Sequence, residues 1–298
     1  MLEKIVCPAC NSENERNRTI CATCTGSLGF PNVNLLKDPY FQVPLDSLFQ
    51  ESLNKAIGLN KKDLIEGFCS ALDAAGKAVV NMDLALLTKI LSGEDYLPYH
   101  LAVEAGKRPK TTVLNEMKRS TVEAAFYASD GMKIVYASLS LDGIGLINYG
   151  SISISLKTNT IATRTSVFSE NSYFLYDRFL DAGWRPGNSL CPSGELGTWE
   201  ERNKIVINKL FDEIIRNNGE VSNFPSILLK NGDGRSEDDF LELHIYNLIN
   251  QHHIEDITFT KNKRTILSEA DDADYMETQL LVLEEKLSST GIDYKWLN

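Results

Sequence analysis

Four cysteines near the N-terminus are the residues whose type and spacing most clearly imply chemistry. They form two Cys-x-x-Cys pairs, Cys7 with Cys10 and Cys21 with Cys24, separated by ten residues. Each pair forms a tight turn that directs two thiolates to one point, and two such turns complete a tetrahedral zinc site with Zn–S bonds of about 2.3 Å. The intervening residues are too polar to form a core, so the metal is expected to supply the folding free energy of this segment.

The cysteine pattern resembles the zinc ribbons found at the N-termini of many bacterial proteins, over residues 4–28. A zinc ion bound by four cysteines has no open coordination position, so we expect a structural clip or a module that docks a protein or nucleic acid, and not a catalytic metal. Of the six cysteines, the two that remain are Cys69 and Cys191. Cys69 lies on the apolar side of a predicted helix and Cys191 has no basic neighbour in sequence, so both are predicted to be unreactive thiols.

A second group of residues, in the last two thirds of the chain, forms three segments that resemble motifs of bacterial ADP-ribosyltransferase-like proteins. The first is Tyr136-Ala-Ser-Leu-Ser-Leu141, followed by Tyr149-Gly150 and an apolar stretch ending in Leu156-Lys157. The second is Arg164-Thr-Ser166-Val-Phe-Ser-Glu-Asn-Ser172. The third is Phe240-Leu-Glu242-Leu-His-Ile245, followed by Ile254-Glu-Asp-Ile257.

The resemblance implies an enzyme that transfers ADP-ribose from NAD to a macromolecular acceptor, as a bacterial toxin or defence effector would. Cleavage of the nicotinamide–ribose bond passes through an oxocarbenium-like state, which a nearby carboxylate stabilises. By the resemblance, Glu242 supplies that carboxylate, and the remaining candidates contact NAD through ribose hydroxyl, nicotinamide ring or pyrophosphate. These candidates are Tyr136, Tyr149, Arg164, Ser166 and His100.

Several positions depart from the motifs of that family. Phe168 stands where a second threonine is usual, Glu170 and Asn171 replace Gly-Asp, and His244 replaces a glutamine two places after the carboxylate. Phe240 stands where arginine-specific transferases carry Glu or Gln, so arginine is not the expected acceptor.

The alternative is a non-enzymatic interaction protein that binds a protein or nucleic-acid partner through the zinc ribbon. On this interpretation Glu242 is simply the polar position of a half-buried strand. A third hypothesis is a nucleic-acid regulator. The net charge of −11 and the pI near 5.0 oppose it, because phosphate binding depends on Lys and Arg.

The elements that must position these residues follow from hydrophobic periodicity. Residues 30–43 contain two prolines, are followed by a third at position 44, and are predicted to be a linker. Three short helices are predicted over 45–57, 64–72 and 84–91, the last two capped by Asn60 and Asn81. Strands are predicted over 134–141, 151–157, 163–168, 240–245 and 254–260, and helices over 199–217 and 271–290. The alternation in 151–157 predicts a half-buried strand with its serines exposed.

The predicted fold class is α+β, because neither a regular βα alternation nor a phosphate-binding glycine loop is present. The predicted organisation is a zinc ribbon (1–30), a helical block (31–95), an ADP-ribosyltransferase-like domain with a split sheet (96–265) and a C-terminal helix (266–298). The N-terminus has no signal-like apolar core, and no apolar run reaches eighteen residues, so a cytoplasmic protein without a membrane span is expected. Expected partners are NAD, the protein or nucleic-acid acceptor, and a regulatory protein.

Overall fold

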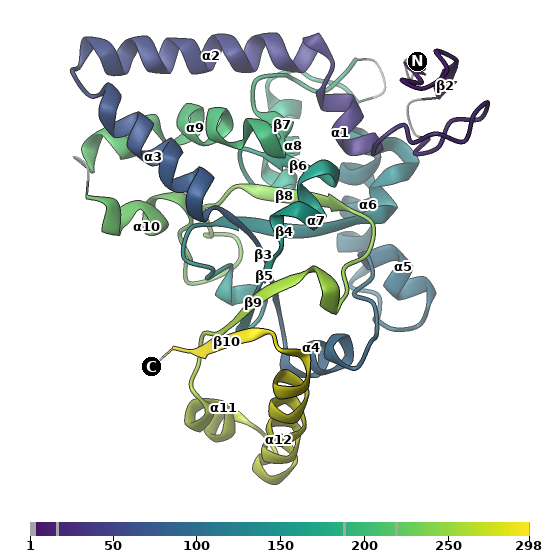
Figure 1. Ribbon diagram of the computed structural model, residues 1–298, viewed down its shortest axis with the longest axis vertical. Helices are drawn as coiled ribbons and strands as arrows, with labels where there is room; N and C mark the ends of the chain where they lie inside the picture. The colour runs from purple at the N-terminus through teal and green to yellow at the C-terminus, as the bar shows by residue number, and fades with distance from the viewer. Residues whose placement is uncertain (1–3, 16–17, 187–188, 218–219, 298) are drawn as a thin grey trace.

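The computed structural model describes residues 4–15, 18–186, 189–217 and 220–297 (Figure 1). An eight-stranded sheet in the order β10-β9-β5-β3-β4-β8-β6-β7 forms its centre. Every neighbouring pair is antiparallel except β9 and β10, which are parallel, so the sheet is mixed. The strands are β3 (Lys77–Met82), β4 (Ile134–Ser140), β5 (Ile152–Leu156), β6 (Thr165–Phe168), β7 (Leu196–Thr198), β8 (Glu242–Tyr246), β9 (Ile254–Phe259) and β10 (Asp293–Trp296). The predicted α+β class is confirmed.

Helices cover the two ends of this sheet (Figure 1). Three helices contact β7, namely α1 (Pro31–Leu36), α2 (Pro39–Gly58) and α9 (Arg202–Arg216). Beside α9 lie α3 (Lys62–Ala75) and α10 (Phe224–Leu228), and α10 also contacts β4. Near β9 and β10 lie α4 (Leu84–Leu91), α11 (Lys263–Glu269) and α12 (Ala273–Thr290). The remaining helices are α5 (Tyr99–Glu104), α6 (Val113–Tyr127), α7 (Thr158–Ile161) and α8 (Ser172–Asp181).

The helices predicted from long amphipathic patterns are present close to their predicted bounds. In α9, Ile205, Leu210 and Ile214 are buried against the sheet and against α2 and α3. A capping box of Thr198 and Glu201 starts the short 3-10 turn that leads into this helix. In α12, Leu280, Leu283 and Leu287 are buried. Among the described residues, no helix is long and apolar enough to cross a membrane.

The predicted linker over residues 30–43 is wrong, because this segment forms α1 and the start of α2. Both helices begin with a proline, Pro31 and Pro39, at a position where the missing N–H costs nothing and the fixed φ is helical. Asp38 caps α2 by accepting from the N–H of Tyr40 at 2.9 Å. These two prolines therefore start helices and do not interrupt them.

The region 31–95 is not a helical block alone, because β3 lies between β5 and β4 in the middle of the sheet. Asn81 belongs to this strand, and the true cap of α4 is Asp83, which accepts from the N–H of Leu86 at 2.8 Å. Asn60 also has a different position from the predicted one, since it follows the end of α2 with a φ of 59° and Lys61 is the N-cap residue of α3.

The serines of β5 are not exposed as predicted, since Ser153 and Ser155 are fully buried. The loop after β4 covers that face of the strand. Asn81 donates to Ser153 Oγ at 3.0 Å, and the Gly145 N–H donates to the same oxygen at 3.2 Å. The C-terminal region also holds more than the predicted helix, because β10 extends the sheet beside β9.

Candidate functional site

The four N-terminal cysteines come together around a two-stranded hairpin of β1 (Lys4–Val6) and β2 (Glu13–Glu15), and their Sγ atoms all lie within 4.8 Å of one another. Both Cys-x-x-Cys turns have the same geometry. The N–H of Asn11 donates to Cys7 O, the N–H of Thr25 donates to Cys21 O, and Asn11 and Thr25 adopt left-handed φ values of 58° and 59°. The cluster can therefore hold a metal ion.

The sulfur geometry fits a tetrahedral metal. The Sγ atoms of Cys7 and Cys24 are 3.6 Å apart, as are those of Cys10 and Cys21. Bonds of about 2.3 Å at tetrahedral angles imply sulfur separations of about 3.8 Å. The apolar core of this segment consists only of Cys7, Cys21 and Leu28 with a half-buried Ile5, among the residues described. So small a core contributes little stability of its own, and a bound metal would stabilise this segment.

The cysteines outside the cluster are expected to be unreactive in the folded protein. Burial raises the pKa of Cys69 to about 11 and that of Cys191 to about 12, so almost no reactive thiolate is present near pH 8. We expect iodoacetamide at pH 8 to leave both unmodified in the metal-loaded chain, and to modify them once the chain is unfolded. Peptide mass spectrometry measures this, and rapid native labelling of Cys191 would show that its side chain is not buried.

Glu242 faces a polar cavity of about 210 Å³. Its side chain is nearly buried, with 6 % of the residue exposed, and its strand is paired with β4 and β6. The sequence-predicted residues Tyr136 and Tyr149 line the same cavity. The other polar lining residues include Arg108, Arg119, Arg235, Tyr99, Asn171 and Tyr173.

One oxygen of the Glu242 carboxylate is held in place by two donors. Oε2 accepts from the N–H of Ser172 at 2.7 Å and lies 2.9 Å from Nε2 of His244. Ser172 is the first residue of α8, where the helix dipole favours a negative charge. Within the described part of the chain, no hydrogen bond reaches Oε1, so this oxygen can contact a ligand.

Cationic and aromatic side chains alternate around the cavity. The guanidinium of Arg119 lies 4.5 Å from the ring centroid of Tyr99 and 5.5 Å from that of Tyr136. The guanidinium of Arg235 lies 4.5 Å from the ring centroid of Tyr149. Such a lining binds anionic groups through the arginines and flat rings through the tyrosines.

His100 does not line the cavity and instead contacts a second carboxylate beside it. Its Nε2 lies 2.5 Å from Glu123 Oε2, and Tyr136 donates to Glu123 Oε1 at 2.8 Å. Burial, with a smaller effect of Glu123 and Glu242, raises the pKa of Tyr136 well above its ordinary value, so the hydroxyl remains a donor. His100 therefore supports the cavity wall through Glu123.

Arg164 and Ser166 also lie away from the cavity. Arg164 Nη1 donates to the carbonyls of Tyr246 and Leu248, and burial lowers the pKa of the guanidinium to about 10. Ser166 is fully buried, and its hydroxyl lies 3.0 Å from that of Tyr127. The structure thus places Glu242, Tyr136 and Tyr149 at one cavity. The other three predicted residues, His100, Arg164 and Ser166, do not line it.

The sequence analysis does not identify the arginines of the cavity. Arg119 lies on α6, a helix that the apolar pattern does not reveal because its first turns present Val113, Leu114 and Met117 to solvent. Arg235 directly follows Asn231-Gly-Asp-Gly234, a sequence typical of turns, so the only local signal for it is a basic residue after a turn.

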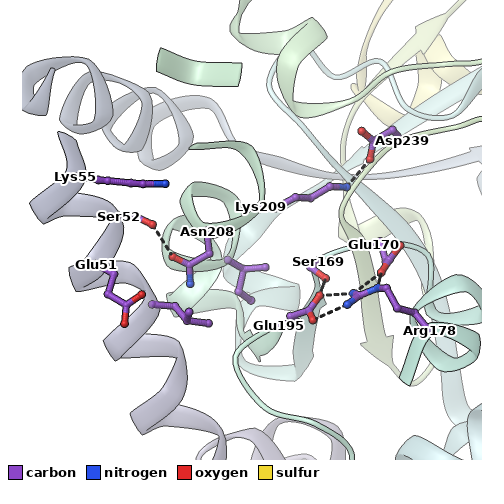
Figure 2. Close-up of a pocket in the computed structure, with 12 residues that line it drawn as sticks. Glu51, Ser52, Lys55, Ser169, Glu170, Arg178, Glu195, Asn208, Lys209 and Asp239 are labelled. Carbon is purple, nitrogen blue, oxygen red and sulfur yellow. Dashed lines mark hydrogen bonds and ion pairs between the residues drawn. The ribbon is translucent and has the colours of Figure 1, made fainter. Parts of the chain in front are cut away.

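The largest cavity described, about 740 Å³, lies elsewhere, between α2, α9 and the loop after β6 (Figure 2). Its charges largely neutralise one another. Arg178 is paired with both Glu170 and Glu195, and Lys209 is paired with Asp239. In the cavity at Glu242, by contrast, Arg119 has one carboxylate partner, Glu123 at 3.7 Å, and Arg108 and Arg235 form no ion pair among the described residues. That cavity is therefore the better candidate for binding a charged ligand.

Comparison with models of protein families gives no match, and comparison with curated proteins gives none either. The functional argument therefore depends on two local arrangements. These are the cysteine cluster and the cavity in which a held carboxylate faces arginines and tyrosines.

Proposed function

We propose that the chain is an NAD-dependent ADP-ribosyltransferase with a split-sheet transferase fold, and that its reaction takes place at Glu242. The observation that carries the proposal is a buried carboxylate with one oxygen held by protein donors and the other available to a cavity of arginines and tyrosines. A site of this composition provides negative charge for a cationic transition state and positive charge for phosphates.

The lining residues have chemically distinct roles in this reaction. Tyr136 and Tyr149 would pack on the nicotinamide ring, and Arg119 and Arg235 would bind the pyrophosphate. As the C1′–N bond breaks, its electron pair leaves with nicotinamide, and the positive charge that develops on the ribose faces Glu242 Oε1. The acceptor nucleophile then bonds to C1′ and loses its proton to the carboxylate or to water.

The size of the site supports a dinucleotide. A second cavity of about 370 Å³ adjoins the first and shares Asn81, Tyr96, Leu97, Arg108 and Tyr149 with it. The smaller cavity alone falls below the usual range of ligand sites, about 300–1,000 Å³, whereas the two together fall within it. Arg108 and Tyr149, at the junction, would contact the middle of the molecule.

We also infer that the metal of the cysteine cluster is zinc and that its role is structural. Four thiolates in a tetrahedron favour zinc over hard cations, which prefer oxygen ligands. The cluster uses all four positions on protein sulfurs, so the zinc module would stabilise the N-terminal segment and would not contact NAD.

The anion-binding role of Arg119 can be tested on NAD binding alone. We expect Arg119→Ala to raise the Kd for NAD about ten- to hundred-fold, because a charge-assisted hydrogen bond contributes about 1.5–3 kcal/mol. Isothermal titration calorimetry of the zinc-loaded protein measures this. The control is Arg216→Ala, which removes an arginine from the end of α9, away from the cavity. Equal affinities of the two variants would exclude Arg119 from the phosphate site.

A wild-type chain that neither binds NAD nor releases nicotinamide would favour the second candidate, a non-enzymatic interaction protein. One observation supports that candidate, since Val6 and Ile20 on the cysteine module are 57 % and 55 % exposed. Exposed apolar side chains of this kind are frequent at protein contacts.

A further inference from the structure

A chain of buried hydrogen bonds reaches Glu242 through residues that do not line the cavity. His244 Nε2 lies 2.9 Å from Glu242 Oε2, and His244 Nδ1 lies 2.7 Å from the hydroxyl of Tyr127. That hydroxyl is 3.0 Å from Ser166 Oγ, which accepts from Asn32 Nδ2 at 3.2 Å. Asn32, Ser166 and His244 are each at most 1 % exposed. This hydrogen-bond chain therefore links α1 to the carboxylate through residues on β6, α6 and β8.

The Glu242 end of the hydrogen-bond chain determines the direction of its donors. The carboxylate of Glu242 can only accept. In the neutral imidazole, His244 then carries its proton on Nε2, and its Nδ1 accepts from the Tyr127 hydroxyl. The Ser166 hydroxyl lies 3.0 Å from the Tyr127 oxygen and 3.4 Å from the backbone carbonyl oxygen of His244, so its single proton has two acceptors. From Tyr127 to Glu242, each donor therefore points toward the carboxylate.

The surroundings of His244 leave its ring one orientation. The ring of Phe168 stacks on it with a centroid distance of 4.0 Å, and the ring of Tyr136 meets it edge-on at 4.8 Å. Asn32 Nδ2 also donates to the backbone carbonyl of His244 at 3.0 Å. A ring held by these neighbours and at both nitrogens fixes the position of Glu242 Oε2 and hence the direction of Oε1.

We propose that Tyr127 and His244 are positioning residues that hold the Glu242 carboxylate in one orientation toward the cavity. The kinetic consequence of this arrangement rests on the proposed function, whereas the hydrogen-bond chain does not. The glutamine that the transferase motifs place at this position also offers a donor and an acceptor, but it lacks the rigid ring that Phe168 and Tyr136 hold in one orientation.

The test is Tyr127→Phe, which removes the hydroxyl and keeps the ring. Tyr176→Phe is the matched control, since Tyr176 packs in the same apolar cluster and its hydroxyl has no hydrogen bond among the described residues. Two measurements are made on the full-length zinc-loaded chain. One is the 15N spectrum of the His244 ring, assigned by its loss in His244→Gln. The other is kcat and KM for nicotinamide release from NAD.

We expect the wild type and Tyr176→Phe to show the neutral Nε2–H tautomer of His244 with Nδ1 hydrogen-bonded. Tyr127→Phe should shift the Nδ1 resonance and lower kcat about ten-fold or more with KM nearly unchanged. If the wild type lacks NAD turnover but shows this tautomer and shift, the positioning chain stands and the transferase proposal fails. A wild-type Nδ1–H tautomer, or a Tyr127→Phe variant identical to Tyr176→Phe in both measurements, would overturn the positioning proposal.

Discussion

Glu242→Gln is expected to reduce nicotinamide release from NAD about 100- to 1,000-fold, the largest effect that any single substitution in the cavity should have. Removing one electrostatic contact made in the transition state has a cost of this order in other enzymes. The substitution removes the negative charge that faces the ribose and keeps the size of the side chain. NAD binding should weaken far less than turnover, because the arginines that hold the phosphates are untouched.

The fold should tolerate this substitution. The amide oxygen of glutamine can still accept from the N–H of Ser172 and from Nε2 of His244, so no buried donor loses its partner. We expect the melting temperature to change by no more than about 3 °C, equivalent to roughly 1 kcal/mol. Nicotinamide release, NAD titration and thermal unfolding of the same sample separate the three effects.

Glu195→Gln is the matched control for charge removal. Glu195 lies in the larger cavity, where it pairs with Arg178 and accepts from Ser169. Its loss should leave nicotinamide release unchanged. If Glu242→Gln retains wild-type turnover, the carboxylate is not part of the reaction, and the cavity is at most a binding site.

The strands and helices predicted correctly are those whose pattern is complete within one segment. The alternation in β5 and the long apolar stripes of α9 and α12 can be read without knowing their partners. By contrast, β3 is a short Ala-Val-Val run between two helices, and its strand character depends on pairing with β4 and β5, more than 50 residues later. Non-local pairing of this kind leaves little local signal.

The residues of the candidate site differ in the same respect, since a local motif predicts some of them and not others. Glu242 and Tyr136 belong to neighbouring strands, and their motifs predict a shared site without knowledge of any contact. Arg119 reaches the cavity from α6, and no local pattern distinguishes it from a surface arginine. Arg164 shows the converse, because its motif suggests a ligand contact, while Nε and Nη1 of its guanidinium donate to backbone carbonyls and the residue does not line the cavity. A motif gives the residue type, whereas packing decides which atoms face the cavity.

Removing the metal is expected to unfold the cysteine module and leave the sheet intact. Structural zinc binds such segments with an apparent free energy of about 10–16 kcal/mol, far more than the few buried side chains of this module can supply. Cys21→Ser, which removes a buried ligand, should abolish stoichiometric zinc binding and the hydrogen-exchange protection of residues 4–28. Metal analysis and hydrogen-exchange mass spectrometry measure the two effects.

The matched control is Cys69→Ser, which alters a half-buried thiol outside the cluster and should keep one zinc per chain. In Cys21→Ser, α1 should remain protected, because Leu36 packs in a core cluster of the main fold that contains no residue of the module. Nicotinamide release should therefore persist without zinc, since Asn32 and the rest of the hydrogen-bond chain that ends at Glu242 stay in place. Loss of turnover together with the metal, in a sample whose sheet remains protected, would instead show that the module acts on the site through α1.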